Sequence, residues 1–347
     1  MNTTPGREAA TDRIVAEDAA TDRIVAEDAA TDRIVAEDAA TDRIVAEAVD
    51  RALAEDLGPD GDLTAALVPD GTTAHFALRS RQAGVLAGRA PATEAFRRVD
   101  PTLTLEWHAA DGDELRPGDT VLDVTGPLRP ILTAERTALN FLCHLSGVAT
   151  LTARYVAAAA ERNPTVQVLD TRKTTPGLRT LEKAAVRAGG GTNHRAGLSD
   201  AVLVKDNHLA GTSITDAVAR AQALWPGRLV EIECDDLDQV AEAARAGADA
   251  VLLDNMDPAT VVEAVRAAHL AAPGPILTEV SGGVTLETVG AYAAAGPDRI
   301  SVGALTHSAP VLDLGLDLIW QSDAAAPRGT NEGPTTNEGP TTNEGIR

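Results

Sequence analysis

The chain has 347 residues, and 52 aspartates and glutamates outnumber 30 lysines and arginines, which gives a formal net charge of −22. This acidic balance argues against nucleic acid or an anionic membrane surface as a bulk partner, and an anionic ligand would need a local cluster of bases. The only two cysteines, Cys143 and Cys234, exclude a disulfide framework and favour a reducing compartment such as the cytoplasm.

Repeats occupy both ends of the chain. The decapeptide AATDRIVAED recurs from Ala9 onward, and the pentapeptide TNEGP recurs from Thr330 onward. Ten residues turn an α-helix by about 280°, so the Ile-Val pairs of successive copies do not form one apolar stripe. We therefore expect residues 1–38 to be a flexible extension and residues 321–347 to be a low-complexity, disordered tail. The chain shows neither a signal peptide nor an apolar run long enough for a membrane span.

Short strands and helices are predicted over residues 39–145. TAHFALRS and DGDELRPGDTVLDVTG alternate apolar and polar residues as half-buried strands do, and APATEAFRRVD between them reads as a helix. Two helices follow over residues 133–162, and we expect Ser146 and Gly147 to break them apart. This part of the chain is typical of a β-rich domain.

From Thr165 onward, strands and Ala-rich helices alternate strictly. Uniformly apolar strands between amphipathic helices indicate a parallel sheet that is buried on both faces. Six such units favour a closed or partly open α/β barrel over a Rossmann sheet, and no G-x-G-x-x-G motif follows a strand. The candidate strands are residues 165–170, 201–205, 228–233, 250–254, 275–280 and 299–303.

Polar residues stand at the ends of these strands, at the edge where α/β barrels keep their active sites. The strands end, in order, on Asp170-Thr171-Arg172-Lys173, Lys205, Glu233, Asp254, Glu279 with Ser281-Gly282-Gly283, and Val302-Gly303-Ala304. One or two such charges would be ordinary solvated residues. Charges at five of six strand ends predict an active site.

The residue types at these ends point to anions and to one cation. Arg172 and Arg195 can each bind a carboxylate or phosphate bidentately, through two parallel hydrogen bonds, and Lys173 and Lys205 add point charges. Three glycines precede His194, either to bring the backbone close to a ligand or as a plain flexible connection. The carboxylates at the strand ends suit a divalent metal carried with a diphosphate, or an oxocarbenium ion. An aldolase that forms a Schiff base with Lys173 or Lys205 is the alternative.

The stretch DTRKTTPGLRTLEKAAVRAGGGTNHRAGLSDAVLVKDNH resembles the signature of the quinolinate phosphoribosyltransferase family. The similarity continues through EIECDD, VLLDNM, EVSGGV and ISVGALTHS, and it extends upstream through ERTALNFLCHLSGVAT. These motifs occur in order over about residues 48–318, and the terminal repeats lie outside them.

The resemblance implies a fold and an activity. It implies an N-terminal α/β sandwich domain over residues 39–145, followed by an incomplete (open) α/β barrel of the type II phosphoribosyltransferase kind over residues 146–320, with the boundary helices packing against both. It implies Mg²⁺-dependent transfer of phosphoribosyl from phosphoribosyl pyrophosphate to quinolinate, giving nicotinate mononucleotide, pyrophosphate and CO2 for NAD biosynthesis. It further implies a homodimer, or a hexamer built as a trimer of dimers, with sites at the subunit interface.

The resemblance also implies roles for residues. Arg136 would reach the site of a partner subunit, and Lys173, Lys205, Glu233 and Asp254 would be catalytic, with the two carboxylates on the metal and ribose side. The substrate-binding set would be Arg136, Thr171, Arg172, Lys173, His194, Arg195, Lys205, Glu233, Asp254, Ser281, Gly282, Gly283, Val302, Gly303 and Ala304. A phosphoribosyltransferase-like protein of molybdenum transport and a non-catalytic scaffold are the alternative functions.

Overall fold

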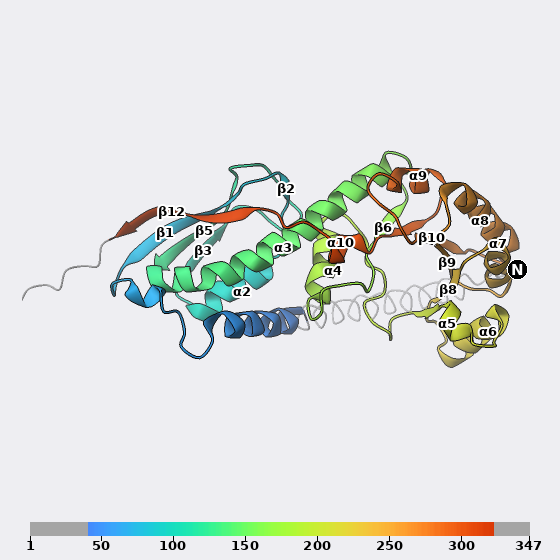
Figure 1. Cartoon of the computed structure of the whole chain (residues 1–347), viewed down its shortest axis with the longest axis horizontal. Helices are drawn as coiled ribbons and strands as arrows, with labels where there is room; N and C mark the ends of the chain where they lie inside the picture. Colours follow the sequence, from blue (N-terminus) through green and yellow to red (C-terminus); the bar gives the residue numbers. More distant parts are fainter. Residues whose placement is uncertain (1–40, 323–347) are drawn as a thin grey trace, which may run out of the picture.

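The computed structural model describes residues 41–322 and divides them into a sheet domain and a barrel domain that share one long helix (Figure 1). The predictions for the two terminal repeats therefore lie outside the described residues. No helix among these residues is long and apolar enough to cross a membrane.

The sheet domain is built on a four-stranded antiparallel sheet of order β12-β1-β5-β3. Alternate residues of β1, such as Phe76 and Leu78, are buried on the face that the helices cover. Its elements are a helix over residues 41–57, η1 (Ala65–Leu67), β1 (Thr73–Ser80), β2 (Gly84–Val85), α2 (Arg89–Val99), β3 (Thr104–Trp107), β4 (Glu114–Leu115), β5 (Thr120–Pro127) and β12 (Leu314–Ser322).

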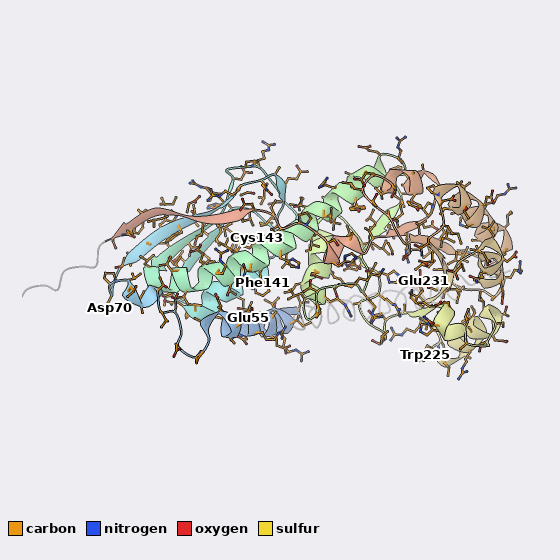
Figure 2. The ribbon with its side chains drawn as sticks, viewed as in Figure 1. Glu55, Asp70, Phe141, Cys143, Trp225 and Glu231 are labelled. Atoms are coloured by element: carbon orange, nitrogen blue, oxygen red, sulfur yellow. The ribbon has the colours of Figure 1, made fainter. Side chains whose placement is uncertain are left out.

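Helix α3 (Leu128–Ala160) is continuous across both domains, so the predicted break at Ser146 and Gly147 is wrong. A Cβ atom at position 147 would lie 2.1 Å from the carbonyl oxygen of Pro310, and Ser146 bonds both backbone groups of Ala87. These two small residues let other segments approach the helix closely, and they do so without interrupting it. Phe141 and Cys143 lie in this central stretch (Figure 2).

Strand β12 corrects the predicted domain limits. The sequence predicts residues 314–320 in the barrel and residues 321–322 in the tail, but β12 pairs antiparallel with β1 from Leu314 to Ser322. The chain thus returns from the barrel to cover an edge of the first sheet, which would otherwise present unpaired backbone groups. The pairing joins segments about 240 residues apart, which local pattern cannot foresee.

The barrel domain confirms the predicted open α/β barrel. Its six strands are all parallel, in the order β6-β11-β10-β9-β8-β7, and the barrel is open between β6 and β7. The strands are β6 (Gln167–Leu169), β7 (Val202–Val204), β8 (Val230–Cys234), β9 (Ala250–Asp254), β10 (Leu277–Ser281) and β11 (Arg299–Ser301). The helices between them are α4 (Arg179–Ala188), α5 (Asp206–Leu209), α6 (Ile214–Leu224), α7 (Leu237–Arg245), α8 (Pro258–Ala271), α9 (Val289–Ala294) and α10 (Ala304–His307).

Candidate active site

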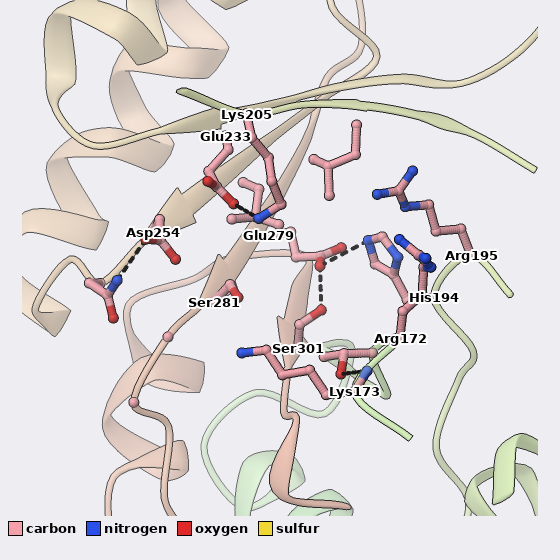
Figure 3. A pocket seen from close by; sticks show the side chains of 16 residues that line it. Arg172, Lys173, His194, Arg195, Lys205, Glu233, Asp254, Glu279, Ser281 and Ser301 are labelled. Carbon is pink, nitrogen blue, oxygen red and sulfur yellow. Dashed lines mark hydrogen bonds and ion pairs between the residues drawn. The ribbon is translucent and has the colours of Figure 1, made fainter. Parts of the chain in front are cut away.

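A cavity of about 470 Å³ opens at the carboxyl ends of the barrel strands (Figure 3). Parallel strands bring their carboxyl ends to one edge, so side chains far apart in sequence meet there. The predicted site residues that line it are Thr171, Arg172, Lys173, His194, Arg195, Lys205, Glu233, Asp254, Ser281, Gly282 and Gly283.

Four predicted residues do not line the cavity. Arg136 lies exposed on α3, in its sheet-domain half. Val302 to Ala304 follow β11 just behind the lining, where the backbone of Gly303 packs against the Lys173 side chain. The lining residues outside the predicted set are Leu203, Leu252, Asn255, Glu279 and Ser301.

The basic side of the cavity holds Arg172 and Arg195. The buried Nε of Arg172 has no hydrogen-bond partner among the described residues, and one terminal nitrogen of Arg195 donates to the carbonyl of Ala201 at 3.3 Å. Burial and then the charge of Arg172 lower the pKa of Arg195 from its ordinary value. Two guanidinium groups that repel each other in a partly buried site favour an anion between them.

The acidic side holds two carboxylates, each tied to a neighbour. Glu233 at the end of β8 pairs with the ammonium group of Lys205, and its side chain is 13% exposed. Asp254 at the end of β9 accepts a hydrogen bond from the side-chain amide of Asn255 at 2.6 Å. Both remain open to the cavity. They can therefore stabilise positive charge that develops on a ligand between them and the basic side.

His194 stands over a buried acidic floor. Its Nε2 lies 3.1 Å from Glu231 Oε2 and 3.3 Å from Glu279 Oε1, and Ser301 donates to the same oxygen of Glu279. Burial alone would lower the pKa of His194, but the bonds to the two carboxylates outweigh it and raise the pKa to about 9. The ring is therefore a cation at neutral pH.

Sequence reasoning missed the roles of Glu231 and Glu279, although a signal for both was present. Inward residues of a barrel strand alternate, so Glu231 lies one layer below Glu233, and Glu279 one layer below Ser281. Figure 2 shows Glu231 within the barrel. The period of two thus places a carboxylate beneath the ends of β8 and β10.

Two carboxylate sets could hold a metal ion. Among the described residues, one group of three potential ligands has its ligand atoms within 4.8 Å of one another, namely His194, Glu231 and Glu279. One oxygen of Glu231 and one of Glu279 already bond Nε2 of His194, and the second oxygen of each is buried without a hydrogen-bond partner among the described residues. Glu233 and Asp254 face the open cavity instead. Such a pair suits Mg²⁺, which binds through one or two carboxylates together with water and phosphate oxygens.

The loops after β9 and β10 pack closely against each other at Gly282. The N–H of Asn255 donates to the carbonyl of Ser281 at 2.9 Å, and Asn255 has a φ of 53°. Gly282 has a φ of 92°, and a Cβ atom there would lie 2.2 Å from the side-chain oxygen of Asn255. A side chain at Gly283 would meet no atom within 4 Å. The loop thus offers bare backbone to the cavity, as phosphate-binding loops do.

The two cysteines take no part in the cavity. Cys143 is half-buried on α3 and Cys234 is buried at the end of β8. Burial, helped by the acidic neighbours, raises the pKa of Cys234 to about 12, so it stays a thiol and packs as a small apolar residue. A reducing, cytoplasmic location stays a prediction.

Family models match both domains of the chain. The model described as quinolinate phosphoribosyl transferase, N-terminal domain, matches residues 62–146, and the model for the C-terminal domain matches residues 148–317. The matched ranges meet within α3, and the second range ends inside β12.

Named relatives and solved structures agree with the family models. A nicotinate-nucleotide pyrophosphorylase [carboxylating] of Mycobacterium leprae is 44% identical over 278 residues, covering 78% of this chain and 96% of the relative. A probable enzyme of the same name from Bacillus subtilis is 39% identical, covering 78% and 92%. The structure of the nicotinate-nucleotide pyrophosphorylase from Francisella tularensis superposes with a TM-score of 0.75 at 38% identity, covering 80% of this chain and 96% of that one.

Proposed function

The chain belongs to the quinolinate phosphoribosyl transferase family, and we propose that it transfers phosphoribosyl from phosphoribosyl pyrophosphate to quinolinate with loss of CO2. The products are nicotinate mononucleotide, pyrophosphate and CO2, and the first of these is a precursor of NAD. One observation carries the proposal: a single cavity sets four basic side chains, Arg172, Lys173, Arg195 and Lys205, beside the carboxylates of Glu233, Asp254 and Glu279.

Quinolinate binds on the basic side of the cavity. It is a planar dianion, and the guanidinium groups of Arg172 and Arg195 are planar forks that can each donate two hydrogen bonds to one carboxylate. The mutual repulsion of the two arginines is relieved when a dianion lies between them. The cationic ring of His194 adds a third positive group to this side.

The ribose lies on the acidic side. As pyrophosphate leaves, positive charge develops at the anomeric carbon, and Glu233 and Asp254 stabilise it. Lys205 fixes the position of Glu233, and Asn255 fixes that of Asp254. Lys205 also lines the cavity, so its ammonium group can contact a departing anionic oxygen.

The phosphate groups bind at the ends of β10 and β11. Ser281, Gly282 and Gly283 offer a hydroxyl and bare backbone there. Lys173 also lines the cavity, and a Cβ atom at Gly303, between Val302 and Ala304, would lie 3.2 Å from its Cδ atom, so glycine leaves room for this side chain.

Decarboxylation then follows from the chemistry of the substrate. The pyridine nitrogen attacks the anomeric carbon as the bond to pyrophosphate breaks, and the nitrogen becomes cationic. The bond from the adjacent ring carbon to its carboxylate then breaks, CO2 departs, and the electron pair stays on that carbon beside the positive nitrogen. A proton completes nicotinate mononucleotide. No nucleophile of the protein is required.

Mg²⁺ fits this site as a cofactor. Lys205 engages one oxygen of Glu233 and Asn255 engages one of Asp254, so each carboxylate keeps an oxygen for the ion or for its water shell. Mg²⁺ would neutralise charge on the pyrophosphate leaving group. The protein residues still orient the ribose and hold the dianion without the ion.

We propose further that the active enzyme is a homodimer, or a hexamer of such dimers, whose sites are shared between subunits. Arg136 is exposed, lies on the sheet-domain half of α3 and does not line the cavity of its own chain. The open face of the sheet also carries Ile319 and Trp320, which are 44% and 46% exposed. Large apolar side chains on one face are typical of a surface that a partner covers.

The purified chain, mixed with quinolinate, phosphoribosyl pyrophosphate and Mg²⁺, tests the proposal. Chromatography with mass spectrometry should detect nicotinate mononucleotide, and chelation by EDTA should abolish its formation until Mg²⁺ is restored. Nicotinate in place of quinolinate should give little product, because it offers one carboxylate to two arginines. No nucleotide from quinolinate would refute the activity, and full turnover in EDTA would refute only the metal.

A further inference from the structure

Helix α4 lies between the two segments that carry the basic side chains of the cavity. The first basic loop, residues 171–178, precedes α4 and carries Arg172. The second basic loop, residues 189–197, follows it and carries His194 and Arg195. Side chains of α4 itself do not line the cavity, but three of them bond to the backbone of these loops.

Arg179, the first residue of α4, bridges both loops. Its Nε donates to the Thr174 hydroxyl at 3.0 Å, and one terminal nitrogen donates to the carbonyl of Arg172 at 3.3 Å. The other terminal nitrogen donates to the carbonyl of Ala196, in the second loop, at 3.0 Å. One rigid guanidinium group thus spans the backbone beside Arg172 and the backbone beside Arg195.

Lys183, one turn further along, holds the backbone of His194 together with Asp170. The N–H of His194 donates to Asp170 Oδ1 at 2.9 Å, and the ammonium group of Lys183 donates to the carbonyl of His194 at 2.9 Å. Lys183 and Asp170 also pair with each other, and their side chains are 4% and 0% exposed. The ion pair therefore fixes the residue on both sides of its Cα atom.

Glu182 fixes the first loop in the same manner. Its fully buried carboxylate accepts the N–H of Thr175 at 3.0 Å and bonds His144 Nε2, on α3, at 2.8 Å. Arg179, Glu182 and Lys183 are spaced i, i+3 and i+4, so they lie on one face of the helix.

Stability alone does not explain this cluster. Apolar residues of similar volume would pack a buried helix face as well as a buried ion pair, or better. Directional bonds to loop backbones do what apolar packing cannot, because they fix where each loop lies to within a few tenths of an ångström.

We propose that Arg179, Glu182 and Lys183 are positioning residues that set the separation of Arg172 and Arg195. This separation makes the cavity selective for a ring with two adjacent carboxylates over one with a single carboxylate. The inference rests on the proposed function, since it takes quinolinate as the dianion that the two arginines share. Each of the three residues acts through a loop and touches no substrate.

Arg179→Met and Arg179→Lys test the proposal, because Arg179 is half-buried and its loss leaves no charge buried alone. The measurements are kcat, the KM for each substrate, and the inhibition constant of nicotinate as a monocarboxylate competitor. Arg179→Met should raise the quinolinate KM at least about tenfold, while the KM for phosphoribosyl pyrophosphate and the nicotinate inhibition constant change less than about twofold. Arg179→Lys, which reaches fewer acceptors, should recover part of the loss.

A double variant and a matched control separate positioning from general loosening. If Arg179 acts through the two arginines, Arg179→Met should raise the quinolinate KM much less in the Arg172→Ala background than in the wild type. Arg266→Met, at an exposed arginine on α8, should leave every constant unchanged. The double variant Lys183→Met with Asp170→Asn removes both partners of the buried ion pair together. It should lower the preference for quinolinate over nicotinate, and it provides an independent test if Arg179→Met folds poorly.

Three results would overturn the proposal. They are an unchanged quinolinate KM in Arg179→Met, an equal rise for both substrates, or full additivity with Arg172→Ala. A wild-type chain that makes no nucleotide from quinolinate would instead refute the proposed function, so the two failures are distinguishable.

Discussion

Nε2 of His194 lies 3.1 Å from a carboxylate oxygen of Glu231, which is buried inside the barrel one layer below the strand ends. Glu279 approaches the same nitrogen from the next strand but one, at 3.3 Å. Burial disfavours the charged form of the ring, whereas the two carboxylates favour it. Their combined effect is the larger and raises the pKa of His194 to about 9. The His194 ring above this acidic floor is therefore cationic, on the side of the cavity where a dianion is proposed to bind.

We predict a loss of quinolinate binding at alkaline pH. The pKa of His194 in the folded protein lies above its ordinary value of 6.5. The stabilisation of the fold by the protonated ring is therefore complete below about pH 6.5 and is lost as the pH rises through about 9. A shift of this size corresponds to about 3 kcal/mol. NMR titration of the ring should give the raised pKa, and the quinolinate KM should climb above pH 8. A ring that titrates near pH 6.5, with a flat KM profile, contradicts the assignment.

Removal of either guanidinium from the basic side should weaken quinolinate binding. Arg172→Ala and Arg195→Ala should each raise the quinolinate KM by the equivalent of about 2–5 kcal/mol, because the remaining arginine faces two carboxylates alone. Circular dichroism should show an unchanged fold. Steady-state kinetics provide the test, with Arg266→Ala on α8 as the control. A quinolinate KM that is unchanged in both variants would remove the basis of the assignment.

Two truncations of the chain should have opposite outcomes. A chain without residues 1–38 and 328–347 keeps β12 and both family-matched regions, so we expect its activity and melting temperature to stay close to those of the full chain. A chain that ends at Asp313 loses β12, bares the edge of β1, and should lose several kcal/mol of stability or precipitate. Thermal melts and size-exclusion chromatography measure both. Equal stability of the two truncated chains would show that β12 is dispensable.

Mixed subunits test the proposed sharing of the site. Arg136→Ala and Arg172→Ala subunits should each have little activity alone at a quinolinate concentration that suffices for the wild type. When mixed they should regain up to roughly a quarter of the wild-type sites, since one site of a mixed dimer carries neither change. Exchange under mild denaturant, with heterodimers identified by native mass spectrometry, provides the measurement. Heterodimers without activity would show that Arg136 acts at the active site of its own subunit.

Much of the cavity could be predicted because parallel strands all end at one edge. Arg172, Glu233 and Asp254 are about 20 to 80 residues apart in sequence, yet each stands at or just after the carboxyl end of an apolar strand, which is enough to bring them together. The layer below is absent from the predicted site set: Glu279 is placed at a strand end but given no role, and Glu231 lies within its strand, where only the alternation of side chains marks it as inward.

Other features depend on contacts that no local pattern contains. Gly147 resembles a helix breaker in sequence, but its role is set by Pro310, which approaches from the far end of the chain. The pairing of β12 with β1 likewise joins the two ends of the fold. The function of Arg179 depends on Ala196, a neighbour only after the two loops have folded around α4.

The stoichiometry of CO2 release tests the central claim most directly. Quinolinate labelled at the carboxylate next to the nitrogen should release labelled CO2 in equal amounts with nicotinate mononucleotide and pyrophosphate, and only when phosphoribosyl pyrophosphate is present. Decarboxylation requires the cationic nitrogen that phosphoribosyl transfer creates. Release of pyrophosphate without CO2, or of CO2 without phosphoribosyl pyrophosphate, would contradict the account.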